Sequence, residues 1–332
     1  MSTISNSGVC QEMIDLSTSI FLLTSLSVSL IIALTALPLL IWATWMLWNM
    51  KQSKLFHINF KIIVQIHLFG FMLHCTGRSL LHIIDLYNYN FKDPCDMIPN
   101  IYRCFILRLM YNSGLWITNS TAISLIIERW IATENSVTYE RSSVIIGMCL
   151  AILQLIIASI PLGFLYSNTK FDGVTMFYCV TAKASTPYAP QISGFFSICA
   201  QITARIMFHY LYKRNKRMRE TKTRATLSNR YQLEQNITSI RILKTFANLS
   251  SVYIIFQNAC FITLLHFAAN LPSYQYFAMT ELNGSYPTYS IITVFVISRS
   301  ITRIRRKVDN NLQLHVKAPI KTYFDNFNKQ IS

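Results

Sequence analysis

The sequence is poor in charged residues, which make up 13% of its 332 residues, about half the share in an ordinary soluble domain. Hydrophobic residues make up 52% and fall in long blocks, so the composition excludes a soluble domain and predicts a polytopic membrane protein. Seven blocks can each cross ~30 Å of hydrocarbon: 20–48, 58–87, 102–131, 144–166, 189–212, 245–269 and 274–298. We expect an all-α membrane protein, a seven-transmembrane helix bundle at 20–298, between an extracellular N-terminus (1–19) and a tail (299–332).

Three further absences bear on function. The first 19 residues contain no Lys or Arg, so they lack the basic region of a cleavable signal peptide, and we expect the first span to be its own insertion signal. The tail after Arg299 has no cysteine for palmitoylation. No loop carries a metal-spaced His/Cys cluster or a nucleophile–base pair, so we expect no catalytic residue, no metal and no cofactor, and the sequence disfavours an enzyme.

The net charge of +16 would suit a nucleic-acid partner, but the positions of the charges favour another cause. Of the 30 Lys and Arg residues, 23 fall in the first, third and fifth connections or in the tail. The N-terminal segment and the other connections hold four. By the positive-inside rule the N-terminus lies outside and the C-terminus is cytoplasmic, and we expect no nucleic-acid partner. The basic run from Lys213 also suits acidic partners or anionic lipid, and the tail suits an amphipathic helix on the inner leaflet.

Cysteine positions become informative once this topology is set. Cys10, Cys95, Cys104 and Cys179 fall outside, in the oxidising compartment, where an even number permits two disulfides. We expect Cys104 to pair with Cys179, which ties the top of the third span to the loop after the fourth. The second expected pair is Cys10 with Cys95, and free or partly paired thiols are the alternative for these two.

The second span carries polar residues at helical spacing. His67, His74, Arg78, His82 and Asp85 fall within an arc of ~80° on a helix with 100° per residue. A stripe of this kind cannot face lipid, and two glycines at its edge permit close contact with a neighbouring helix. For the first two histidines a hydrogen-bond network between helices is the alternative to a ligand cavity. Arg78 and Asp85, nearer the outer end, are better ligand candidates because charges inside a membrane are costly.

The third and seventh spans add to this polar interior. Arg108 and Asn112 lie on one face of the third span. Glu281 is a carboxylate inside the seventh span, where an unpaired charge is costly, so we expect a partner, either Arg78 or Arg108. The candidate ligand cavity consists of Arg78, His82, Asp85, Arg108, Tyr111, Asn112 and Glu281.

Two motifs resemble those of a known family. The inner end of the third span reads Glu128-Arg129-Trp130-Ile131-Ala132-Thr133 and is followed by Tyr139-Glu140. The stretch before the sixth span reads Leu227-Ser-x-Arg230-Tyr231-Gln232, with Glu234 and Asn236 after it. Together the motifs resemble nematode serpentine chemoreceptors of the Sra superfamily, class AB first and class A next, which are seven-transmembrane G-protein-coupled receptors.

The resemblance implies a receptor that binds a small environmental or secreted molecule in an outer cavity and activates a heterotrimeric G protein. It also implies a plasma-membrane location in a sensory cell. The fifth and sixth helices would part on activation, and Arg129 would be held by Glu128 or a neighbouring helix when inactive. An interfacial charge pair is the alternative interpretation of Glu128 and Arg129. The implied switch and coupling residues are Glu128, Arg129, Thr133, Tyr139, Glu140, Arg230 and Tyr231.

Several motifs of rhodopsin-like receptors are absent. The sixth span has no Cys-Trp-x-Pro, the fourth has no Trp, and the seventh ends without Asn-Pro-x-x-Tyr. Only the Arg129 position and the Cys104–Cys179 bridge carry over from those receptors. A transporter or channel that uses the same polar faces as a path is the competing function class. Against it, the sequence shows no inverted repeat and no pair of Gly- or Pro-broken helices.

Overall fold

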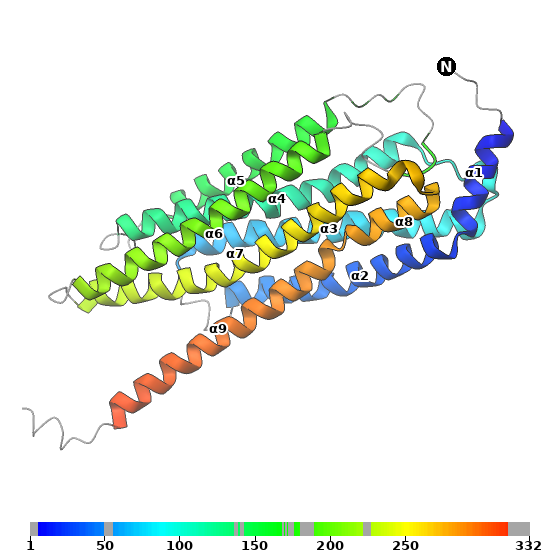
Figure 1. Ribbon diagram of the computed structural model, residues 1–332. Helices are drawn as coiled ribbons and strands as arrows, with labels where there is room; N and C mark the ends of the chain where they lie inside the picture. Colours follow the sequence, from blue (N-terminus) through cyan, green and yellow to red (C-terminus); the bar gives the residue numbers. More distant parts are fainter. Residues whose placement is uncertain are drawn as a thin grey trace, which may run out of the picture.

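Figure 1 shows the computed structural model of the protein as a bundle of long helices. The structure describes residues 6–49, 56–135, 139, 143–167, 169, 171, 176–179, 189–221 and 227–317, without the side chains of 6, 7, 227–232, 269, 305 and 307–317. In chain order the α-helices are α1 (Asn6–Thr18), α2 (Ile20–Asn49), α3 (Ile58–Phe91), α4 (Ile101–Glu134), α5 (Val144–Tyr166), α6 (Ala189–Thr221), α7 (Leu227–Phe267), α8 (Ser273–Asn283) and α9 (Tyr286–Lys317). Short 3₁₀ turns lie at Pro94–Asp96 and Ala268–Asn270.

The predicted spans correspond to α2 through α7 and, for the last, to α8 together with α9. By composition and length alone, α2, α3, α5 and the part of α7 from Leu233 to Phe267 are apolar enough to cross a membrane. The other long helices contain charged residues in their interior or at a basic end, which lowers their hydropathy. The fold is the expected all-α seven-transmembrane bundle.

Two helices continue beyond their predicted ends. α6 reaches Thr221 and α7 begins at Leu227, so the two form a long hairpin, visible in Figure 1. The stretch before residue 245 therefore extends the sixth helix. α9 runs without a break from Tyr286 to Lys317, so the basic amphipathic segment continues the seventh helix and is not a separate element.

Glycines bring α3 and α4 into close contact. A Cβ atom added at Gly114 of α4 would lie 2.3 Å from the carbonyl oxygen of Gly70 and 2.5 Å from the backbone nitrogen of His74, both on α3. One at Gly77 would lie 3.0 Å from the backbone nitrogen of Tyr111. Since only glycine permits this approach, the predicted small-residue contact at the edge of the polar stripe is confirmed. The contact places the polar face of α3 against α4.

The seventh span is interrupted where α8 ends and α9 begins. Gly284 is the C-cap of α8, and Pro287 lies in the first turn of α9, where its missing N–H leaves no helical hydrogen bond unmade. A helix break frees carbonyl groups that must find other donors within a membrane. The guanidinium of Arg78 supplies them, donating to the carbonyl oxygens of Glu281 and Gly284.

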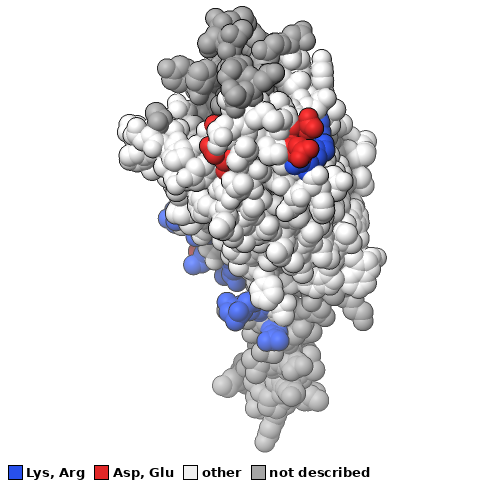
Figure 2. Space-filling view, turned by 90° about the vertical axis from the view of Figure 1, so that its right-hand side faces the viewer, with Lys and Arg blue, Asp and Glu red and all other residues white. Residues whose placement is uncertain are grey.

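One end of the bundle, called here the disulfide end, holds the Cys10–Cys95 and Cys104–Cys179 bridges, both present as expected. α1 covers this end, and its Met13 and Leu16 side chains are fully buried in a cluster with residues of α8 and of the loop before α6. Figure 2 looks onto this end and shows a surface with few charged side chains. The opposite end, called the basic end, includes Arg129 and Arg214, and α9 projects beyond it in Figure 1.

Candidate functional site

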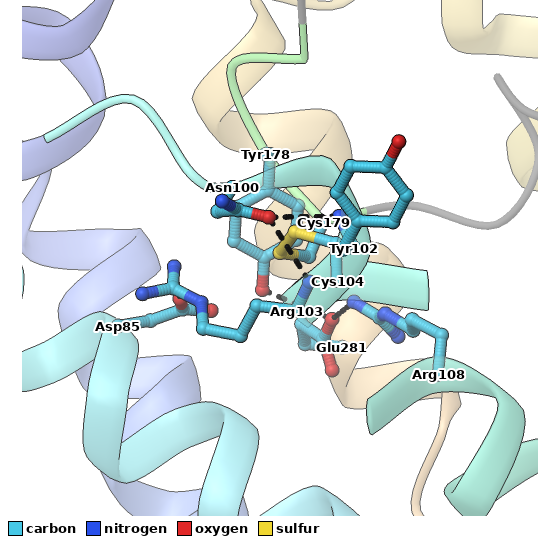
Figure 3. Close-up of a disulfide and its surroundings, with 9 residues drawn as sticks. All are labelled: Asp85, Asn100, Tyr102, Arg103, Cys104, Arg108, Tyr178, Cys179 and Glu281. Carbon is cyan, nitrogen blue, oxygen red and sulfur yellow. Dashed lines mark hydrogen bonds and ion pairs between the residues drawn. A yellow bond between two sulfur atoms is a disulfide. The ribbon is translucent and has the colours of Figure 1, made fainter. Parts of the chain in front are cut away.

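Glu281 of α8 is the centre of a buried ion cluster near the disulfide end. Its Oε1 accepts hydrogen bonds from Arg108 Nη2 at 2.7 Å and from Tyr178 Oη at 2.9 Å, and its Oε2 accepts one from Arg78 Nη2 at 3.2 Å. The sequence left the choice between the two arginines open, and the structure places both against the carboxylate. Figure 3 shows Arg108 and Tyr178 on either side of Glu281. Two cations share one carboxylate here.

Arg78 uses all three of its guanidinium nitrogens within the protein. Nε donates to His82 Nε2 at 3.0 Å, and Nη2 also lies 3.4 Å from Ser29 Oγ of α2. Because His82 Nε2 accepts this bond, it carries no proton and the imidazole is neutral. Together with the two carbonyl contacts at the α8–α9 break, these bonds join α2, α3 and the seventh span. Arg78 therefore has a structural role at the helix break.

The disulfide positions Tyr178 against this cluster. Tyr178 precedes Cys179, which is bonded to Cys104 at the start of α4, and its ring stacks on Phe277 of α8 with 4.7 Å between centroids. Burial raises the pKa of Tyr178, and the Glu281 carboxylate raises it further, so the hydroxyl keeps its proton and donates it. The loop before α6 is thus joined to α4 by a covalent bond and to α8 by a hydrogen bond.

Asp85 lies one turn nearer the disulfide end than His82. One carboxylate oxygen is 4.0 Å from Arg103 Nη2, and both side chains are drawn in Figure 3. The side chain of Asp85 is 7% exposed and that of Arg103 is 28% exposed, so the carboxylate of this pair is buried and its guanidinium is partly exposed. Counting it with the Glu281 cluster gives three guanidinium groups, on Arg78, Arg103 and Arg108, and two carboxylates.

A cavity of about 170 Å³ adjoins the ion cluster. Side chains of α4, α5, α6, α7 and α8 line it, and Arg108, Tyr111 and Asn112 of the predicted set are among them. Arg108 is 5.2 Å from the Tyr111 ring centroid, and Asn112 Nδ2 donates to Tyr166 Oη at 2.7 Å. The other predicted residues, Arg78, His82, Asp85 and Glu281, lie in the cluster next to the cavity and do not line it.

The lining also contains residues that were not predicted from the sequence. Several are neutral polar side chains from α4, α6, α7 and α8: Trp116, Asn119, Ser197, Gln257, Asn258, Thr280 and Asn283. Their helices meet only through tertiary packing, so spacing along the chain gives no sign of them. A second cavity, of about 160 Å³, lies toward the basic end between α2, α3, α7 and α9, and its lining is almost wholly apolar.

The two deeper histidines of the α3 stripe are hydrogen-bonded between helices. His67 Nδ1 lies 3.0 Å from Thr121 Oγ1, and His74 Nδ1 lies 3.0 Å from the carbonyl oxygen of Tyr111. Both partners belong to α4. The structure therefore favours the network interpretation of these histidines over a ligand role.

Arg129 is the centre of a second cluster, at the basic end. Its guanidinium forms a two-point ion pair with Glu128, whose Oε1 also accepts from Tyr139 Oη. Burial and the Glu128 carboxylate raise the pKa of Tyr139, which keeps its hydroxyl protonated as a donor. Arg129 Nη1 donates to Asn236 Oδ1 of α7 at 3.1 Å, and the guanidinium lies 5.5 Å from the Phe60 ring centroid. Arg129 is held by Glu128 and by a neighbouring helix at once.

An amide network extends this cluster to α6. Asn236 Nδ2 donates to Asn215 Oδ1 at 2.9 Å and to Thr133 Oγ1 at 3.1 Å, and Asn215 Nδ2 donates to Thr133 Oγ1 at 2.9 Å. All three side chains are buried, Asn215 completely. We call Glu128, Arg129, Thr133, Asn215 and Asn236 the inner lock. It joins α4, α6 and α7.

The motif residues fall unevenly on the described part of the chain. Glu128, Arg129, Thr133 and Tyr139 meet in or beside the inner lock. Glu140 lies outside the described residues, as do the side chains of Arg230 and Tyr231 at the start of α7. Asn215 was missed because it stands within a basic run that reads as a loop.

Comparison with known proteins places this geometry in a family. The family model described as "Serpentine type 7TM GPCR receptor class ab chemoreceptor" matches residues 7–332. Among proteins of Caenorhabditis elegans, serpentine receptor class alpha/beta-14 is 27% identical over 199 residues, 58% of this chain and 51% of that protein. Serpentine receptor class beta-17 is 24% identical over 206 residues, 59% of this chain and 54% of that protein.

Serpentine receptor class beta-15 is 22% identical over 240 residues, 71% of this chain and 68% of that protein. The chain spans about half the length of the first two relatives. The family match covers nearly all of the chain, including both bridges, the cavity and the inner lock. The chain therefore belongs to the serpentine class ab chemoreceptor family of seven-transmembrane G-protein-coupled receptors.

Proposed function

We propose that this protein is a chemosensory receptor of the plasma membrane that binds a small environmental or secreted molecule and activates a heterotrimeric G protein. In this proposal the disulfide end faces outside and the basic end faces the cytoplasm of a sensory cell. The positive-inside charge distribution and the pairing of cysteines at one end support this orientation. The expected domains are an extracellular N-terminus at 1–19, the bundle at 20–298 and a cytoplasmic tail at 299–332.

One observation carries the proposal: the cavity and the inner lock involve the same helices. α4, α6 and α7 line the cavity near the disulfide end, and α4, α6 and α7 are joined by the lock at the basic end. A ligand that changes how these helices pack in the cavity would therefore act on the contacts of the lock. A ligand shifts such an equilibrium only by its difference in affinity for the two packings.

The lock suits a two-state switch chemically. While it is closed, Arg129 is satisfied by Glu128 and Asn236, and α6 and α7 cover the basic end of α4. When α6 and α7 move away, Arg129 loses Asn236 and becomes available to a carboxylate, carbonyl or C-terminus of a G protein. Comparison with known proteins gives no support to a transporter or channel that would use the same polar faces.

The test is guanine-nucleotide exchange on added heterotrimeric G proteins, in membranes that contain the wild type, Arg129→Ala or Arg205→Ala. Arg205 is exposed on α6 and serves as a matched control. We expect a mixture of secreted metabolites to stimulate exchange by the wild type and by the control, and not by Arg129→Ala at equal surface number. A metabolite-dependent current or uptake without exchange on any G protein would refute the proposal.

A further inference from the structure

We infer that the cavity beside Glu281 takes a small organic anion, a carboxylate on a compact body, and that Arg108 is its main contact. This inference rests on the proposed receptor function and names the chemical class of the ligand. The juxtaposition that carries it is a cavity next to a buried cluster with more cations than carboxylates. Neither the family nor its relatives' names specify a ligand.

The charge balance of the cluster is positive. Arg78, Arg103 and Arg108 face only Glu281 and Asp85, and the neutral His82 adds no charge. The partly exposed Arg103 balances Asp85, which leaves the buried Arg78 and Arg108 against the single carboxylate of Glu281, so one buried positive charge is uncompensated. Keeping an uncompensated charge inside a membrane is costly, so a site of this kind favours an anion.

The excess charge faces the cavity through Arg108. Arg78 has partners for every guanidinium nitrogen, and Arg103 pairs with Asp85 and does not line the cavity. Arg108 donates from Nη2 to Glu281, whereas its Nε is buried without a hydrogen-bond partner among the described residues. Arg108 also lines the cavity, and its side chain is 7% exposed. A carboxylate in the cavity would complete its hydrogen bonding.

Two further groups in the cavity lining can form hydrogen bonds with a ligand. Within the described chain, the buried Nε1 of Trp116 and the buried Oγ of Ser197 have no hydrogen-bond partner. An indole N–H and an arginine N–H can only donate, so both match oxygen atoms of a ligand. Asn119 of α4 and Asn258 of α7 also line the cavity and can bind further polar atoms of the ligand.

Cavity size limits the body of the ligand. At about 170 Å³ the cavity is close to a cavity of about 150 Å³ that holds benzene in another protein. The aromatic rings of Tyr111, Trp116 and Phe261 line it and suit a flat or compact apolar group. A carboxylate on a single ring, or on a short chain, fits both the size and the chemistry.

The test uses the purified full chain in lipid nanodiscs and compares benzoate with benzamide, its neutral isostere. Binding is followed by thermal unfolding and by calorimetry, without any G protein. We expect benzoate to bind and to raise the unfolding temperature, with benzamide at least tenfold weaker because Arg108 prefers a charged acceptor. Equal binding of the two compounds, or equal stabilisation by chloride alone, would overturn the inference.

Two variants tie binding to the proposed contacts. In Arg108→Gln the remaining charges of Arg78 and Glu281 balance, so we expect this variant to fold. We expect its affinity for benzoate to fall about 10- to 100-fold. Arg205→Gln is the matched control and should change affinity by less than about twofold, because Arg205 is exposed, lies outside the ion cluster and does not line the cavity. If Arg108→Gln does not fold, Trp116→Phe keeps the ring and removes one donor, and benzoate should bind about fivefold more weakly.

Unchanged benzoate affinity in both variants would contradict the assignment of Arg108 and Trp116. The binding assay separates this inference from the receptor proposal. If benzoate does not bind but metabolites stimulate nucleotide exchange, the anion site is refuted and the receptor proposal stands. Benzoate binding without exchange on any G protein would support the anion site and refute the receptor.

Discussion

Replacing Asn236 with Ala should open the inner lock without a ligand. In the structure Asn236 accepts one hydrogen bond from Arg129 at 3.1 Å and donates two, to Thr133 at 3.1 Å and to Asn215 at 2.9 Å. The bonds to Arg129 and Thr133 join α7 to α4, so they exist only while α7 covers α4, whereas the bond to Asn215 joins α7 to α6. The substitution therefore weakens the closed arrangement and leaves the open one largely unaffected.

The magnitude follows from the two bonds that join α7 to α4. A bond to a charged group contributes ~1.5–3 kcal/mol and a neutral one ~0.5–1.5 kcal/mol, and part is recovered when water reaches the freed groups. A net loss of about 2 kcal/mol would raise the ratio of open to closed receptor roughly 30-fold. From an open fraction of about 1%, the variant would reach roughly a quarter.

The assay is basal nucleotide exchange, measured without ligand and divided by the number of receptors at the surface. We expect Asn236→Ala to exchange several-fold faster than the wild type. Asn248→Ala is the matched control, an asparagine of the same helix that is outside the lock, and its basal rate should be unchanged. Unchanged or slower exchange by Asn236→Ala, at normal surface number, would refute the idea that this network holds the receptor closed.

Three further predictions concern stability. Glu281→Gln leaves two buried arginines without their carboxylate and should lower the free energy of unfolding by about 3–5 kcal/mol, which would reduce surface expression. Expression at the wild-type level would contradict the ion cluster. Gly114→Ala forces α3 and α4 apart and should lower the free energy of unfolding by at least about 1–3 kcal/mol, measured by thermal unfolding. Gly163→Ala is the control and should be neutral, because nothing lies within 4 Å of the added atom. Equal effects of the two substitutions would refute the close contact. Cys104→Ser should cost about 2–5 kcal/mol, and an unchanged unfolding temperature under oxidising conditions would show that the bridge to Cys179 does not form.

Much of the bundle could be predicted because its signals are local. Spans follow from apolar runs, and the fourth was predicted to the residue. The α3 stripe follows from helical spacing, which requires the polar residues to share a face. The need of Glu281 for an arginine follows from the cost of a lone buried carboxylate, although the sequence did not show that Arg78 and Arg108 would both contact it.

The remaining features depend on tertiary contacts. The break in the seventh span had a sequence signal, Gly284 followed by Pro287, but its stability comes from Arg78, which is distant in the chain. α1 is a short helix with little amphipathic pattern, and it is held by the Cys10–Cys95 bridge and by burial of Met13 against other elements. Nothing in its own sequence distinguishes it from a loop.

The candidate site shows the same division. Tyr178 reaches Glu281 because the adjacent Cys179 fixes its loop, and only the pairing of the cysteines could have suggested this. Asn215 faces Thr133 because α6 extends past the predicted membrane boundary. The cavity itself is a space between five helices, so residues such as Asn258 enter it through packing and not through any motif.

The central claim is that occupancy of the cavity controls the separation of the helices at the inner lock. Distance measurement between spin labels on α4 and α7 tests it most directly, with labels at the exposed Glu134 and Glu234 and with the exposed Cys149 and Cys199 replaced by serine. We expect one short distance without ligand, and a second population at a longer distance in the presence of an activating ligand or in Asn236→Ala. A single unchanged distance under conditions where binding is demonstrated would contradict it.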